Sequence, residues 1–230
     1  MKLSLLKIHI AVLLFGVAGL FAKWLTVHPI ILVFGRVFFA SIALYLILQI
    51  TKQNLSLKNK RDYFFLAILG GLLAFHWVSF FHSIQLSSIA IGLLTYSSFP
   101  LFVTILEPIL FKERFKARSI LSAILAILGI LIIVPEFSFD NTTFKAIVWG
   151  VLSAFSFALL SLANRSYVKK HTALKIAFYE DAAATIFLLP FLFFLTFTFS
   201  FKLVSMLLLL GVVFTAVSHT LFIDGLKKVK

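Results

Sequence analysis

The sequence predicts an all-α integral membrane protein, a multi-span bundle of helices, on three observations. Of its 230 residues, 62% are hydrophobic and only 13% are charged, and the mean hydropathy is +1.11. A soluble domain carries roughly 25% charged residues, because its surface must face water. The apolar residues occur in runs near the ~20 residues that span a bilayer, without the alternation of barrel strands. Helices are therefore the predicted spanning elements, because they satisfy their backbone hydrogen bonds internally.

Eight apolar segments are predicted as spans. They are Ile8–Val27, Pro29–Ile50, Tyr63–Ser83, Ile89–Phe111, Ser119–Val134, Ala146–Ala163, Ala173–Phe199 and Leu203–Leu226. The seventh is long and contains Pro190, so we expect it to kink, to tilt, or to end before its Phe-rich tail, Phe191–Phe201. The N-terminus is similar to a signal peptide, but no small-x-small cleavage site follows Val17. We therefore expect the first apolar segment to be retained as a helix.

The distribution of basic residues predicts the orientation. They concentrate at the two ends and in alternate loops: Lys2 and Lys7; Lys52, Lys58, Lys60 and Arg61; Lys112, Arg114, Lys116 and Arg118; Arg165, Lys169 and Lys170; Lys227, Lys228 and Lys230. The intervening loops hold almost no positive charge. This alternation predicts a multi-pass protein of the inner (cytoplasmic) membrane with a cytoplasmic N-terminus. The basic loops account for the formal charge of +13, so we do not expect nucleic acid as a partner. We expect the loops to contact membrane lipids instead.

Several kinds of chemistry are excluded by the motifs. Neither G-x-x-x-x-G-K-[ST] nor G-x-G-x-x-G is present, which argues against an ATP-driven mechanism. H-E-x-x-H and G-x-S-x-G are also absent, cysteine does not occur, and the six histidines do not cluster with carboxylates at metal-ligand spacing. We therefore predict no catalytic residues, no cofactor and no metal, and the protein is not expected to be an enzyme.

Ionisable residues inside the apolar segments are the candidate binding residues, because a charge at the centre of a span costs about 2.5–3.5 kcal/mol on insertion scales. Arg36 lies roughly 10 Å from the outer end of the second predicted span. It either faces a central cavity and holds an anionic group of a solute, or extends to the interface or pairs with a neighbouring helix. Lys23, close to the outer end of the first span, carries the same two alternatives.

Glu180 and Asp181 lie on the seventh predicted span. Adjacent residues of a helix are about 100° apart, so we expect only one of them to line a narrow pathway or exchange protons. The other is expected to pair with a lysine such as Lys175. We assign Glu180 as a candidate for both solute binding and proton coupling.

Two histidines complete the candidate set. His76 lies in the middle of the third predicted span, next to Trp77, and His219 lies in the eighth. A neutral imidazole is buried at modest cost and can bind a solute or relay protons, although a hydrogen-bonded structural histidine is the alternative for each. The candidate solute-binding residues are Lys23, Arg36, His76, Trp77, Glu180 and His219, and the candidate proton-coupling residues are His76 and Glu180.

An internal repeat is also indicated. Five predicted spans fall in residues 1–135, and a shift of 142 positions aligns Lys23 with Arg165, Phe15 with Phe157 and Ala40 with Ala182. Units with an odd number of spans have opposite topology, a plan that recurs in secondary transporters. We therefore divide the chain into residues 1–135, a first repeat, and residues 136–230, a partial second repeat of three spans.

The order of several short pieces resembles the EamA-type transporters of the drug/metabolite transporter superfamily. They are Ala22–Lys23, Arg36-x-x-x-Ala40, Ala90, Pro100, Glu113–Arg114 and Gly129. The resemblance implies ten helices in two inverted five-helix repeats, alternating access and transport without ATP. The chain departs from the family at Ser122, where glycine is frequent, and we expect it to lack the family's ninth and tenth spans.

The resemblance implies a secondary transporter of small metabolites, amino acids or drug-like solutes. Two alternatives belong to other classes. The expected absence of two spans favours a non-transporting membrane scaffold, a partner subunit or an inactive truncated copy. A membrane enzyme that acts on lipids would need a catalytic cluster at one interface, and only the basic loop Lys112–Arg118 is concentrated there.

Overall fold

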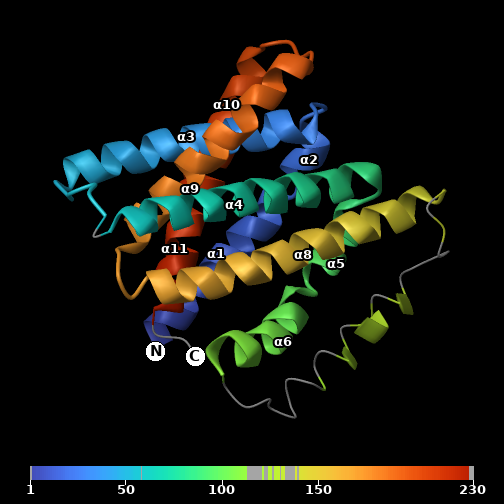
Figure 1. Ribbon diagram of the computed structural model, residues 1–230. Helices are drawn as coiled ribbons and strands as arrows, with labels where there is room; N and C mark the ends of the chain where they lie inside the picture. The colour runs from blue at the N-terminus through green and yellow to red at the C-terminus, as the bar shows by residue number, and fades with distance from the viewer. Residues whose placement is uncertain are drawn as a thin grey trace. The chain divides into compact units, whose positions relative to one another are not determined.

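The computed structural model describes residues 2–57, 59–112, 121, 124, 125, 127–129, 131, 132, 138 and 140–227 (Figure 1). The regular structure of these residues is helical throughout. Seven helical segments within them are long and apolar enough to cross a membrane: Lys2–Trp24, Pro29–Ile50, Lys60–Leu86, Ile89–Phe111, Thr142–Tyr167, Ala173–Phe194 and Phe201–Leu226. The predicted multi-span helical class is confirmed. Half of the residues of the fifth predicted span, Ser119–Val134, lie outside the described residues, as do Glu113, Arg114 and Ser122.

The chain divides into two compact units. One contains Met1–Ala74 with Ala163–Lys230, and the other contains Phe75–Leu162. Helices α4 (Lys60–Leu86) and α8 (Thr142–Tyr167) each contribute residues to both units. The division into repeats 1–135 and 136–230 remains a prediction.

The first unit is built around α3 (Pro29–Ile50), which packs against α9 (Ala173–Leu188) and α10 (Phe201–Gly211). A glycine permits the close approach of α3 and α10, since a Cβ atom added to Gly211 would lie 2.7 Å from the backbone oxygen of Arg36. Small residues at helix crossings let backbones meet in this way, which is how membrane helices gain packing energy.

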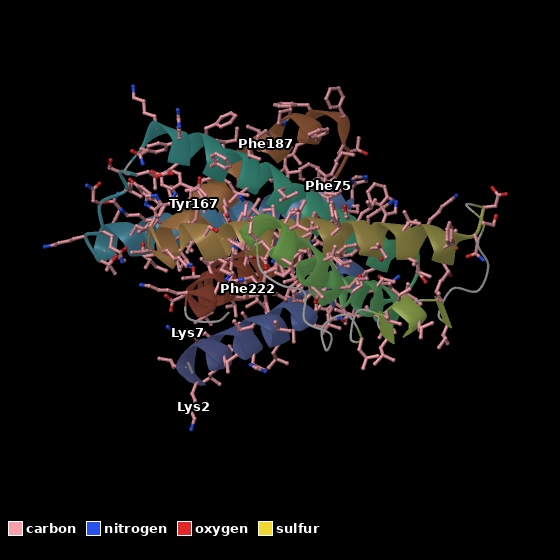
Figure 2. All side chains as sticks on the ribbon, turned by 60° about the horizontal axis from the view of Figure 1, so that its bottom comes forward. Lys2, Lys7, Phe75, Tyr167, Phe187 and Phe222 are labelled. Atoms are coloured by element: carbon pink, nitrogen blue, oxygen red, sulfur yellow. The ribbon has the colours of Figure 1, made fainter. Side chains whose placement is uncertain are left out.

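A second pair of helices completes this unit. The first span is helical from Lys2 but is interrupted between α1 (Lys2–Ala18) and the short α2 (Phe21–Trp24). Helix α1 packs against α11 (Ser218–Leu226), where the rings of Phe15 and Phe222 are 5.8 Å apart. Lys7 of α1, which Figure 2 labels together with Phe222 of α11, forms an ion pair with Asp224 across the same two helices.

The seventh span loses its α-helical geometry near Pro190. Helix α9 ends at Leu188, and a 3₁₀ turn, η1 (Leu189–Phe194), follows. Proline has no N–H to donate to the preceding turn, which explains this change. The α-helix therefore ends before the Phe-rich tail, in line with one of the expected outcomes. Phe193 and Phe194 are 84% and 85% exposed, as lipid-facing side chains are.

The eighth span has an irregularity that the sequence did not predict. Between α10 and α11 the chain winds as a π-helix, η2 (Val212–Val217). Short π-helical turns within α-helices are rare overall, and those that do occur often lie at functional sites.

The second unit contains a broken helix. Helices α5 (Ile89–Tyr96) and α6 (Phe99–Phe111) meet at Ser97 and Ser98, whose hydroxyls donate to the carbonyls of Leu93 and Thr95. Pro100 follows the break, at the second position of α6. Ser88 caps α5 by accepting a hydrogen bond from the Ile91 N–H.

Candidate functional site

Three ionisable side chains meet inside the first unit. Glu180 and Asp181 lie on α9, and His219 lies on α11, which packs against α9. The His219 Nε2 atom is 3.1 Å from Glu180 Oε2, and its Nδ1 atom is 3.4 Å from Asp181 Oδ2. Both carboxylates are fully buried, and His219 is 4% exposed. We call Glu180, Asp181 and His219 the carboxylate–histidine cluster.

The cluster corrects one expectation about the two acidic residues. They were expected to face different directions, with one of them paired to Lys175. Instead, both carboxylates contact the same imidazole, and the Lys175 ammonium donates to the backbone oxygen of Ser56. The ring of His219 enters between the two side chains and presents one nitrogen to each, so the angle of about 100° between adjacent residues does not separate them.

Asn164 of α8 extends the cluster. Its amide nitrogen donates to Glu180 Oε2 at 3.2 Å, and the residue is 1% exposed. Asn164 is not among the residues predicted from the sequence, although a polar amide in an apolar span is a signal that could have identified it. The contact between Asn164 and Glu180 could not be predicted from the sequence, because it depends on tertiary packing.

Three buried oxygens of this group lack a donor among the described residues. They are Glu180 Oε1, Asp181 Oδ1 and Asn164 Oδ1. A buried polar atom normally has a hydrogen-bond partner, and leaving one without costs about 1–3 kcal/mol. Carboxylate oxygens can accept hydrogen bonds but can donate only when protonated. These oxygens are acceptors that the described residues leave without a donor, and a proton added to a carboxylate would turn one of its oxygens into a donor.

Arg36 lies in the same unit and is fully buried on α3. Its Nε atom donates to Thr215 Oγ1 at 2.9 Å, and its Nη2 atom donates to the Phe214 carbonyl at 3.1 Å. Both acceptors belong to the π-helix η2, so the guanidinium connects α3 to the irregular turn that precedes His219. These bonds are those of an arginine paired with a neighbouring helix, and a role in solute binding remains a proposal.

The other candidate residues occupy different places. Lys23 is exposed on α2 in the first unit. His76 and Trp77 are buried in the second unit, within an aromatic group that includes Tyr96 and Phe157. His76 Nδ1 is 2.9 Å from both the hydroxyl and the carbonyl oxygen of Ser153. The structure thus brings together Glu180 and His219 of the six candidates, and places Arg36 against the same helical segment as His219.

These features define a class of protein: a multi-pass helical membrane protein with ionisable residues buried among its spans. The chain belongs to the EamA-like transporter family, whose model matches residues 2–134 and 144–230. The resemblance inferred from the short motifs is therefore confirmed. A solved crystal structure shares the fold, with a TM-score of 0.73 and 18% identity, over 98% of this chain and 79% of the other.

Several relatives are named as transporters. The uncharacterized transporter YxxF of Bacillus subtilis is 26% identical over 97% of this chain and 73% of its own length. The S-adenosylmethionine uptake transporter of Rickettsia felis is 27% identical over 71% of this chain, and the pseudopaline exporter CntI of Pseudomonas aeruginosa is 28% identical over 69%. The matches cover only 54% and 55% of the length of the latter two relatives.

Proposed function

We propose that this protein is a secondary transporter that moves a small metabolite, amino acid or drug-like solute by alternating access, without ATP. It acts in the inner (cytoplasmic) membrane with its N-terminus in the cytoplasm, and it is not an enzyme. The family match and relatives named for uptake or export of small molecules support this proposal. The alternation of basic loops supports the orientation.

The carboxylate–histidine cluster is the observation that carries the proposal. Ionisable residues are expensive within spans and mark solute pathways and proton relays in membrane proteins. His219 contacts both carboxylates, so the three groups together have several protonation states that differ by one proton. With His219 protonated and both carboxylates ionised the cluster has a charge of −1, and one more proton makes it neutral.

We assign proton coupling to Glu180, with His219 as the group that exchanges the proton. Glu180 Oε2 lies 3.1 Å from His219 Nε2, so a proton can pass between the carboxylate and the imidazole at this oxygen. Asp181 contacts the other ring nitrogen and orients the imidazole, and Asn164 orients the Glu180 carboxylate. A neutral cluster crosses an apolar environment at lower cost than a charged one, which links proton uptake to the conformational change.

Solute binding is assigned to the remaining candidates. Arg36 supplies a buried cation for an anionic group, and Lys23 supplies a cation near the end of the first span. His76 with Trp77 supplies an imidazole and an aromatic surface for a solute. We retain His76 as a second residue for proton exchange, because an imidazole can take up and release a proton near neutral pH.

Transport by purified protein in proteoliposomes tests this function. The vesicles would contain a pH-sensitive dye, and a panel of amino acids together with S-adenosylmethionine would be added outside. We expect at least one solute to cause proton movement, and we expect Glu180→Gln to abolish it while exchange of labelled for unlabelled solute continues. Lys145→Ala, a change at an exposed lysine of α8, is the matched control. Unchanged proton movement in the Glu180→Gln protein would refute proton coupling, and no flux of any solute would refute transport of this panel.

A further inference from the structure

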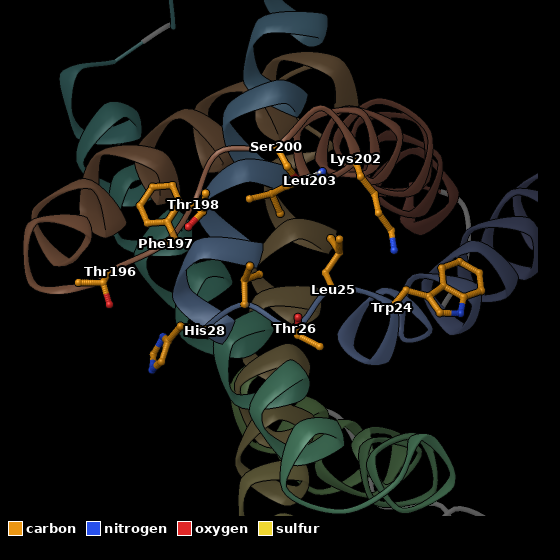
Figure 3. Close-up of a pocket in the computed structure, with 11 residues that line it drawn as sticks. Trp24, Leu25, Thr26, His28, Thr196, Phe197, Thr198, Ser200, Lys202 and Leu203 are labelled. Atoms are coloured by element: carbon orange, nitrogen blue, oxygen red, sulfur yellow. Dashed lines mark hydrogen bonds between the residues drawn. The ribbon is translucent and has the colours of Figure 1, made fainter.

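A pocket of about 350 Å³ opens in the first unit where two non-helical segments approach one another (Figure 3). One segment joins α2 to α3, and the other joins η1 to α10. The pocket is lined by Trp24, Leu25, Thr26, Val27, His28, Thr196, Phe197, Thr198, Ser200, Lys202 and Leu203. None of these residues belongs to the carboxylate–histidine cluster, so the pocket is a separate site.

The lining of this pocket favours an anion. Among the described residues that line it, Lys202 is the one charged side chain and none is a carboxylate, and hydroxyls of threonine and serine supply hydrogen-bond donors. The N-termini of α3 and α10 both lie here, where His28 accepts from the Ile30 N–H and Ser200 accepts from the Leu203 N–H. The positive ends of two helix dipoles add to the charge of the lysine.

An apolar groove of about 150 Å³ adjoins the polar pocket, and Phe197 and Leu203 line both. The groove runs between α3 and α10 under the η1–α10 connection. The described residues that line it are all apolar: Ile31, Phe34, Gly35, Phe38, Phe39, Leu192, Phe197, Phe199, Leu203, Val204 and Leu207. Phe38 and Val204 are 38% and 40% exposed, so the groove is accessible from outside the bundle.

We propose that the pocket and the groove together bind one anionic phospholipid of the surrounding bilayer. The phosphate lies beside Lys202 in the polar pocket, and one acyl chain lies in the groove. A free anion would use the pocket but not the groove. The nearby rings of Phe199 and Phe201 are 77% and 90% exposed, as expected of a surface that contacts hydrocarbon. Trp24, 50% exposed, suits the boundary between headgroup and acyl chains.

Native mass spectrometry of the purified 230-residue chain with added lipid tests the site. Phosphatidylglycerol would be compared with phosphatidylcholine at equal chain length. A basic residue near an anionic lipid surface contributes about 1 kcal/mol, so we expect Lys202→Ala to weaken phosphatidylglycerol binding about fivefold. Val204→Trp fills the groove and should weaken binding of either lipid. The matched controls are Lys145→Ala and Leu208→Trp; Leu208 is an exposed residue of α10 that does not line the groove.

Three results would overturn the proposal. Equal binding of the two lipids by the unaltered protein would mean that Lys202 does not select an anion. Loss of binding in the control variants to the same degree would mean that lipid coats the surface without a site. Displacement of phosphatidylglycerol by millimolar inorganic phosphate, with Val204→Trp having no effect, would identify a site for a soluble anion.

Discussion

The contact between α3 and α10 predicts opposite effects for two glycine-to-alanine changes. A Cβ atom at Gly211 would lie 2.6 Å from Phe39 Cβ and 2.7 Å from the Arg36 carbonyl oxygen, and neither of these atoms can move without the helix. Gly16 lies within α1, and a Cβ atom there would have no neighbour within 4 Å. The two positions therefore compare the same chemical change with and without a close helix contact.

The magnitudes follow from two opposing terms. Alanine in place of glycine within a helix stabilises it by about 1 kcal/mol, and this term applies to both positions. At Gly211, overpacking against backbone costs up to about 3 kcal/mol, which leaves a net destabilisation of about 2 kcal/mol. For a chain of this length roughly 2–4 °C corresponds to 1 kcal/mol, so Gly211→Ala should lower the unfolding midpoint by about 4–8 °C. Gly16→Ala should raise it by about 2–4 °C.

Thermal unfolding of both variants in the same detergent, followed by tryptophan fluorescence, measures these shifts. A midpoint for Gly211→Ala equal to or above that of the unaltered protein would refute the close approach of α3 and α10. A destabilised Gly16→Ala protein would show that alanine is unfavourable in this bundle for a reason other than contact with a neighbouring helix.

Three further changes test other contacts. Arg36→Ala should abolish solute transport in proteoliposomes while membrane expression continues, and normal transport would remove Arg36 from the proposed pathway. Asp62→Ala removes the acceptor 2.8 Å from His171 Nε2 in a pair whose side chains are 3% and 6% exposed. We expect a loss of about 1.5–3 kcal/mol in the free energy of unfolding, measured by denaturant titration, and no loss would contradict the buried pair. Ser88→Ala removes the cap of α5 and should cost about 1 kcal/mol in the same titration, whereas an unchanged midpoint would show that the Ile91 N–H finds another acceptor.

The spans were predictable because insertion into a bilayer depends on composition averaged over about 20 residues. The end of α9 near Pro190 was predictable because proline interrupts a helix through its own backbone, without a contact to a distant residue. The π-helix between α10 and α11 carries no such signal in the sequence. Thr215 stabilises it through a bond from Arg36, a residue 179 positions away.

The candidate site was predictable as a set of residue types and not as an arrangement. Glu180 and His219 were selected because ionisable groups in apolar spans need an explanation. That they contact each other depends on the packing of α9 against α11, which hydropathy does not encode. The same lack of tertiary information led to the wrong partner for one carboxylate and to the omission of Asn164.

The π-helix has a consequence for how the cluster is held together. A π-turn contains one more residue than an α-turn, and each residue of an α-helix accounts for about 100° of rotation about the axis. If Val212–Val217 tightened to α-helical winding while α10 stayed in place, α11 would rotate by roughly that angle. The imidazole of His219 would then face away from both carboxylates. The bonds from Arg36 to Phe214 and Thr215 therefore help to set the rotational position of the last helix, and with it the contact on which a shared proton depends.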